Sequence, residues 1–108
     1  MRIAVADKEG SVADFRDAES FLLFDLENKS VKLAQSVTVR KDWYMSVPEF
    51  LAEEETDAVI CNGIGRGARS SFREADIEVY GGVKGGCEDA MQAFMNGTLS
   101  FDPLAGMM

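Results

Sequence analysis

The sequence predicts a single α/β domain with a mixed five-stranded sheet and about three helices. The first half of the chain contains short apolar runs with the alternation of strands, and the second half alternates such runs with segments of helical period. At 108 residues, with 46% hydrophobic residues, the chain has the size and composition of one globular domain. We expect this domain to span residues 1–99, followed by a flexible tail at 100–108.

Three strands are predicted in the first half. Residues Arg2–Ala6 are rich in apolar and β-branched types, Ser20–Glu27 is apolar on both faces, and Val31–Val39 alternates apolar and polar residues. Asn28 lies between the last two runs and tolerates left-handed backbone angles, so these runs should form a hairpin. The charged segments 8–18 and 40–46 are predicted loops.

The second half begins with a helix. Ser46 is a suitable N-cap, Pro48 fits the first turn, and Glu49 completes a capping box. Phe72 is the expected core anchor of the next helix. The elements that follow the first helix are a strand at 57–62, a helix at 68–75, a strand at 77–80 and a helix at 87–95, which Asn96 and Gly97 end.

This order of elements predicts a sheet topology. With right-handed crossovers, the strands should lie in the order 3-2-1-4-5, with strands 1, 4 and 5 parallel. The carboxyl ends of those three strands then share one edge, which is where open α/β sheets bind ligands. The segments gathered there are Asp7, the loop 14–17, Cys61, the turn 63–67 and the loop 81–87.

A glycine-rich turn follows the strand that ends at Cys61. Backbone N–H groups in this turn, at the start of a helix, can form an anion-binding nest, to which Arg66 and Arg69 add positive charge. The glycines can equally serve only to allow a tight turn. A dinucleotide site is not expected, because the turn follows the fourth strand and no acidic residue ends the next strand. The candidate cofactor-binding residues are Gly63, Ile64, Gly65, Arg66 and Gly67.

The two cysteines are candidate soft ligands for iron, copper or a thiomolybdate cluster. Cys61 and Cys87 are predicted at the ends of the fourth and fifth strands, which should be neighbours. Two thiolates leave the remaining positions to cluster sulfides, a second subunit or exogenous thiols. Their spacing matches no CxxC pattern. Cys61 also has the character of a small core residue, whereas a predicted helix start at Cys87 would lower its thiol pKa.

Composition excludes several classes of function. The formal net charge of −8 repels phosphate backbones, so we expect no nucleic-acid partner. The chain has no histidine, which excludes histidine-based catalysis and histidine metal sites. Asp7 and Asp25 lie on strands that a nuclease would use to hold Mg²⁺, but the other acids do not converge and the charge opposes such a substrate. No apolar run approaches membrane length and no secretory signal is visible, so a cytoplasmic protein without a membrane partner is expected.

Four segments together resemble the nitrogenase iron–molybdenum cofactor biosynthesis family, the small NifX-like cofactor carriers. They are MRIAVADKEG, FRDAESFLLFDLE, DAVICNGIGRGA and IEVYGG…EDAMQAFMNGTL, and they extend from Met1 to about Leu99. Where the family often has His-Phe-Gly-Arg, this chain has Asp14-Phe15-Arg16-Asp17.

The resemblance implies a ribonuclease-H-like fold without enzymatic activity. It also implies binding or delivery of an iron–sulfur or molybdenum-containing cluster, with a cluster donor or acceptor protein as partner and a monomer or weak homodimer as the assembly. The metal ligands would be Cys61, Cys87 and, in place of the histidine, the oxygen donor Asp14. A metal-free protein-interaction or regulatory domain of the same fold is the alternative.

Overall fold

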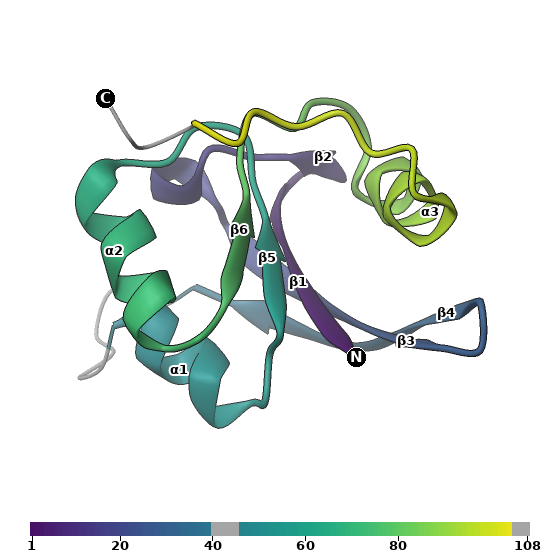
Figure 1. The fold of residues 1–108 in the computed structure, drawn as a ribbon, viewed down its shortest axis with the longest axis horizontal. Helices are drawn as coiled ribbons and strands as arrows, with labels where there is room; N and C mark the ends of the chain where they lie inside the picture. The colour runs from purple at the N-terminus through teal and green to yellow at the C-terminus, as the bar shows by residue number, and fades with distance from the viewer. Residues whose placement is uncertain (40–45, 105–108) are drawn as a thin grey trace.

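The protein, described here from a computed structural model over residues 1–39 and 46–104, is a mixed sheet with helices on both faces (Figure 1). The strands are β1 (Arg2–Lys8), β2 (Ser11–Val12), β3 (Ser20–Glu27), β4 (Ser30–Thr38), β5 (Ala58–Ile60) and β6 (Glu78–Tyr80). The helices are a 3-10 turn η1 (Phe15–Asp17), α1 (Val47–Glu53), α2 (Arg66–Glu74) and α3 (Cys87–Asn96).

The sheet has six strands, one more than the five predicted, because β2 pairs with β1 beside the main path. Its main path runs β4-β3-β1-β5-β6, which is the expected order 3-2-1-4-5 for the five predicted strands. β1 is parallel to β5, β5 is parallel to β6, and β3 forms antiparallel pairs with both β1 and β4. The carboxyl ends of β1, β5 and β6 therefore share one edge, as the sequence predicts.

The segment 8–18 differs from the predicted loop, because it contains the strand β2 and the turn η1. Glu9 and Gly10 have positive φ values of 55° and 88°, and they reverse the chain so that β2 pairs antiparallel with β1. The Gly10 N–H donates to Asp7 Oδ1 at 2.9 Å, which fixes this turn. A two-residue strand is too short to show any alternation in the sequence, which explains why it escapes prediction.

Two hydrophobic clusters cover the two faces of the sheet. Successive β1 side chains point to opposite faces: Ile3 and Val5 join one cluster, and Ala4 and Ala6 join the other. α3 contributes Cys87, Ala90 and Met91 to the first cluster, whereas α1 and α2 contribute Leu51 and Phe72 to the second. Figure 1 shows α3 alone on one side of the sheet and the other two helices together on the opposite side.

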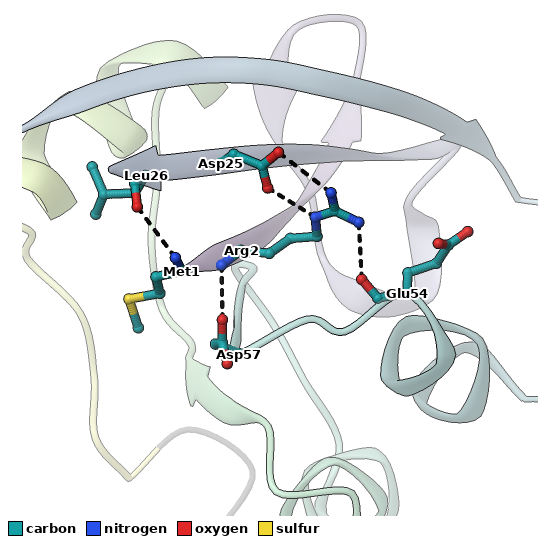
Figure 2. Close-up of polar contacts among 6 residues, drawn as sticks. All are labelled: Met1, Arg2, Asp25, Leu26, Glu54 and Asp57. Carbon is teal, nitrogen blue, oxygen red and sulfur yellow. Dashed lines mark hydrogen bonds and ion pairs between the residues drawn. The ribbon is translucent and has the colours of Figure 1, made fainter. Parts of the chain in front are cut away.

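Arg2 connects three elements at the amino end of β1 (Figure 2). Its guanidinium donates two hydrogen bonds to the Asp25 carboxylate on β3, the shorter at 2.9 Å, and a third to the Glu54 carbonyl after α1 at 2.9 Å. The Arg2 backbone N–H donates to Asp57 Oδ2 at 2.8 Å. This group of contacts, which we name the Arg2 clamp, holds β1, β3 and the α1–β5 connection together at the end of the sheet opposite the predicted ligand edge.

The chain beyond α3 returns across the sheet. Asp102 N–H donates to the Gly81 carbonyl at 2.8 Å, and the Phe101 ring meets the Tyr80 ring edge-on at 4.8 Å. The predicted flexible tail at 100–108 stays a prediction: Phe101 and Asp102 make these contacts, and 105–108 lie outside the described residues. Most of the predicted loop 40–46 also lies outside them.

In the described part of the chain, every helix is too short or too polar to cross a membrane.

Candidate functional site

A groove lies at the carboxyl end of β5, between η1 and the start of α2. Its volume is about 740 Å³. One wall is η1 with the preceding Asp14, and the other is the glycine turn with the first residues of α2. Its lining residues are Asp14, Phe15, Arg16, Asp17, Gly63, Ile64, Gly65, Gly67 and Ala68. Four of the five predicted cofactor-binding residues therefore line one groove, together with Asp14.

The glycine turn leads directly into α2. The helix begins at Arg66 rather than at the predicted residue 68, with Gly65 as its N-cap, and no side chain caps it. The first N–H groups of an α-helix have no acceptor within the helix, and the helix dipole adds partial positive charge there. A Cβ placed on Gly65 or Gly67 would meet no atom within 4 Å, so these glycines leave the groove open rather than relieve a clash.

Asp14 joins the two walls of the groove. Its Oδ1 accepts the Gly63 N–H at 2.8 Å, and the Phe15 N–H donates to the Gly63 carbonyl at 2.7 Å. A Cβ on Gly63 would lie 2.9 Å from Asp14 Oδ1, so a larger residue at this position would displace the Asp14 carboxylate. The first N–H of the predicted anion nest is thus already occupied by a carboxylate of the chain itself.

Phe15 anchors η1 to the domain. Its ring meets Phe72 of α2 edge-on at 5.4 Å and lies 6.1 Å from Phe21 of β3. These contacts place Arg16 and Asp17, both exposed, at the mouth of the groove. The anchoring role of Phe15 is not among the sequence predictions, although a lone aromatic residue in a charged loop is a signal for such an anchor.

Cys61 lies in the core and not in the groove. It is completely buried beside Ala4, Ala6 and Phe72. Burial raises the pKa of its thiol to about 12, so the neutral thiol dominates at physiological pH. Cys61 therefore has the character of a small apolar core residue.

Cys87 is also buried, and the prediction of a lowered pKa is wrong. Burial, together with a 3.4 Å hydrogen bond to Asp7 Oδ1, raises the pKa of this thiol to about 12. The same carboxylate accepts the Gly10 N–H through Oδ1 and the Ser20 hydroxyl through Oδ2, at 2.9 Å each. Asp7, another residue expected at the ligand edge, therefore fixes local structure. Burial first, and the hydrogen bond to Asp7 second, raise the pKa of Cys87 despite its place at a helix start.

The structure does not bring the proposed metal ligands together. Cys61 belongs to the cluster on one face of the sheet and Cys87 to the cluster on the other, so the sheet separates the two thiols. Asp14 lies in the groove. Within residues 1–39 and 46–104, no three His, Cys, Asp or Glu side chains gather closely enough to hold a metal ion. The expectation of a shared thiolate site is corrected: adjacent strand ends do not imply a shared face.

The nuclease arrangement is absent from β1 and β3. Asp25 is opposite Arg2 at the start of β1, whereas Asp7 is opposite Ser20 near its end. At about 3.3 Å per residue the two carboxylates lie on the order of 16 Å apart along the strand, too far to share metal ions spaced about 4 Å apart.

Comparison with protein families gives one match. A family model described as dinitrogenase iron–molybdenum cofactor matches residues 1–97, which includes every described helix and strand and the whole lining of the groove. No match is found among curated proteins.

Solved structures share the fold over nearly the whole chain. The crystal structure of PH0822 is 30% identical with a TM-score of 0.86, and the match covers 94% of this chain and 95% of that one. A Thermotoga protein proposed to be a NifB protein is 25% identical with a TM-score of 0.69, covering 94% and 93%. The apo form of the orange protein from Desulfovibrio gigas is 19% identical with a TM-score of 0.74, covering 94% and 92%, and shows the fold alone.

Proposed function

The chain belongs to the dinitrogenase iron–molybdenum cofactor family, and from this premise we propose that it binds an iron–sulfur or molybdenum-containing cluster in the groove between η1 and α2 and delivers it without catalysing a reaction. Family membership connects the chain with metalloclusters in general. The cluster is the cargo of the protein, and its partner would be a cluster donor or acceptor protein.

The observation that carries the proposal is the open groove at the uncapped start of α2. Its volume of about 740 Å³ exceeds what a single ion needs, and two glycines on its α2 side leave space where side chains would otherwise stand. Terminal sulfides and oxides of a cluster are acceptors, and backbone N–H groups at a helix start are donors.

The chemistry of the lining favours holding the cluster by shape and hydrogen bonding. The lining offers backbone amides, the Arg16 guanidinium and the Phe15 and Ile64 side chains, but neither cysteine. A cargo held without protein–metal bonds would leave more readily when a partner supplies ligands, which suits delivery.

The first test is retention of a metal–sulfur anion. Purified protein would be titrated anaerobically with tetrathiomolybdate, alone and with copper, and separately with iron plus sulfide, then desalted and analysed for metal. We expect stoichiometric retention of at least one of these cargos, accompanied by a charge-transfer band.

Two matched variants locate the cargo. Gly67→Leu places a side chain in the groove at a position with no atom within 4 Å of its Cβ, so the fold should persist while retention is lost. Gln92→Leu adds the same side chain to an exposed site on α3, across the sheet, and should retain cargo like the wild type. Equal retention by both variants would show that the cargo binds outside the groove. A wild-type protein that retains nothing would favour a metal-free interaction domain.

A further inference from the structure

We propose that Asp14 is a specificity-determining residue that limits the charge of the cargo. This inference rests on the proposed function of the groove. A carboxylate fixed in the wall of the groove would disfavour small, multiply charged anions, so the groove would take large cargo of low charge. Asp14 then acts as a selector and not as a metal ligand.

The position of the carboxylate is set by contacts that hold it inside the groove. Asp14 is half-buried, and its Oδ1 accepts the Gly63 N–H at 2.8 Å. On either side of it, the Asn62 N–H donates to the Ala13 carbonyl at 2.9 Å and the Phe15 N–H to the Gly63 carbonyl at 2.7 Å. The backbones of 13–15 and 62–63 are thus paired, and the Asp14 side chain has little freedom to withdraw from the groove.

The charges of the lining point to the same role. Asp14 and Asp17 are its two carboxylates, and Arg16 is its one cationic side chain. The α2 amino terminus adds only about half a positive charge. An anion that approaches the glycine turn therefore meets attraction from the helix start and repulsion from Asp14 beside it, and the repulsion grows with each charge on the anion.

The size of this repulsion follows from Coulomb's law. At about 5 Å in a solvent-exposed groove, with physiological salt, each unit of cargo charge beside Asp14 should lower affinity by about twofold. A dianion would lose about fourfold and a monoanion about twofold. The difference between the two should shrink as salt is added.

The test compares Asp14→Asn with the wild type on two probes of the same shape and different charge, the tetrathiomolybdate dianion and the tetrathioperrhenate monoanion. Asparagine keeps an oxygen that can accept the Gly63 N–H while removing the charge. In equilibrium dialysis, we expect the variant to bind the dianion about fourfold and the monoanion about twofold more tightly. High salt should reduce both gains.

Two further variants keep the test decisive. Glu88→Gln removes the same charge from an exposed site on α3 and should leave both affinities unchanged. If Asp14→Asn proves unstable, Asp17→Asn removes a charge from the same groove without touching Gly63, and it should shift both affinities in the same direction as expected for Asp14→Asn.

The outcomes separate the two proposals. The selector role is overturned if the wild type binds the probes and Asp14→Asn binds them with equal or lower affinity. That result would point to Asp14 as a ligand or a purely positioning residue. An equal gain in Glu88→Gln would also overturn it, because only the net charge would then matter. If the wild type binds neither probe but retains one of the other cargos, the selector role fails alone. If it retains no cargo at all, the proposed function fails and the selector role falls with it.

Discussion

At the scale of single residues, burial decides the chemistry of the cysteines. A thiolate is the form that binds soft metals, and an apolar environment disfavours it. The thiols of Cys61 and Cys87 are enclosed by core side chains on opposite faces of the sheet. Their burial therefore removes them from the ligand set that the sequence predicts and assigns them to packing.

We expect both thiols to resist alkylation in the native protein. With a pKa of about 12, against an ordinary value of 9.0, the thiolate population at pH 8 falls by about a thousandfold, and access is also blocked. Iodoacetamide labelling followed by mass spectrometry should be at least about a hundredfold slower in native than in denatured protein. Rapid labelling of the folded protein at either cysteine would contradict the buried placement.

At the scale of elements, the Arg2 clamp joins parts of the chain that are far apart in sequence. Arg2 contacts β3 through Asp25 and the end of α1 through the Glu54 carbonyl. Both side chains of the ion pair are partly exposed, at 29% and 37%, so solvent weakens the pair. The clamp therefore fixes the amino end of β1, whereas the groove lies at the opposite edge of the sheet.

Arg2→Ala should lower the free energy of unfolding by about 1–2 kcal/mol, because three guanidinium hydrogen bonds are lost from a partly exposed site. Arg2→Lys should recover part of this loss, since one ammonium cannot bridge both partners as the guanidinium does. Urea unfolding at pH 7 measures the change in the free energy of unfolding for both variants. Wild-type stability in Arg2→Ala would show that the clamp contributes nothing.

The clamp also predicts a pH dependence. The hydrogen bond from Arg2 lowers the pKa of Asp25 below its ordinary value of 3.8. A lowered folded-state pKa stabilises the protein above the unfolded value, and this contribution disappears as the pH falls through the folded value. The difference in stability between wild type and Arg2→Ala should therefore shrink below about pH 3.8. A difference that grows on acidification would contradict this assignment.

The start of α1 gives a second prediction for an element. Ser46 Oγ accepts the Glu49 N–H at 3.3 Å, which confirms the predicted N-cap. Ser46→Ala should cost about 1 kcal/mol of stability in denaturant unfolding. Ser71→Ala, in the exposed interior of α2, is the matched control and should change stability by less than about 0.5 kcal/mol. Equal effects would mean that the cap is not used.

At the scale of the whole molecule, the chain closes over the outer end of the sheet. After α3 it passes β6, where Phe101 and Phe94 both contact the Tyr80 ring, and Arg69 of α2 donates to the Pro103 carbonyl at 3.0 Å. The segment 101–104 therefore contacts both β6 and α2 at the edge of the sheet.

Phe101→Ala should lower the free energy of unfolding by about 1 kcal/mol, because the ring contact with Tyr80 is lost although Phe101 is 41% exposed. Leu104→Ala, at a side chain that is 61% exposed, is the control and should have less than half that effect. Thermal unfolding of the wild type and the two variants would measure both losses of stability. If both behave like the wild type, residues 101–104 contribute no stability, as a flexible tail would.

Much of the fold is determined by local sequence. The apolar runs at β1, β3 and β5, the Ser46 cap and the helix stop at Gly97 each depend on a few neighbouring residues, and the handedness of crossovers then orders the strands. The glycine turn at the carboxyl end of β5 is also predictable from neighbouring residues. Gly63, Gly65 and Gly67 interrupt the buried apolar run and allow a tight turn.

What only the tertiary structure decides is which side chains meet. The faces to which Cys61 and Cys87 point depend on strand pleat and helix packing, so two thiols that the sequence predicts at adjacent strand ends are separated by the sheet. Likewise, Asp14 and Gly63 are 49 positions apart in the chain, and only the hydrogen bonds between the segments 13–15 and 62–63 turn a candidate ligand into part of the groove wall. Sequence specifies each element through its neighbours, whereas the chemistry of the site depends on contacts between elements that no local pattern records.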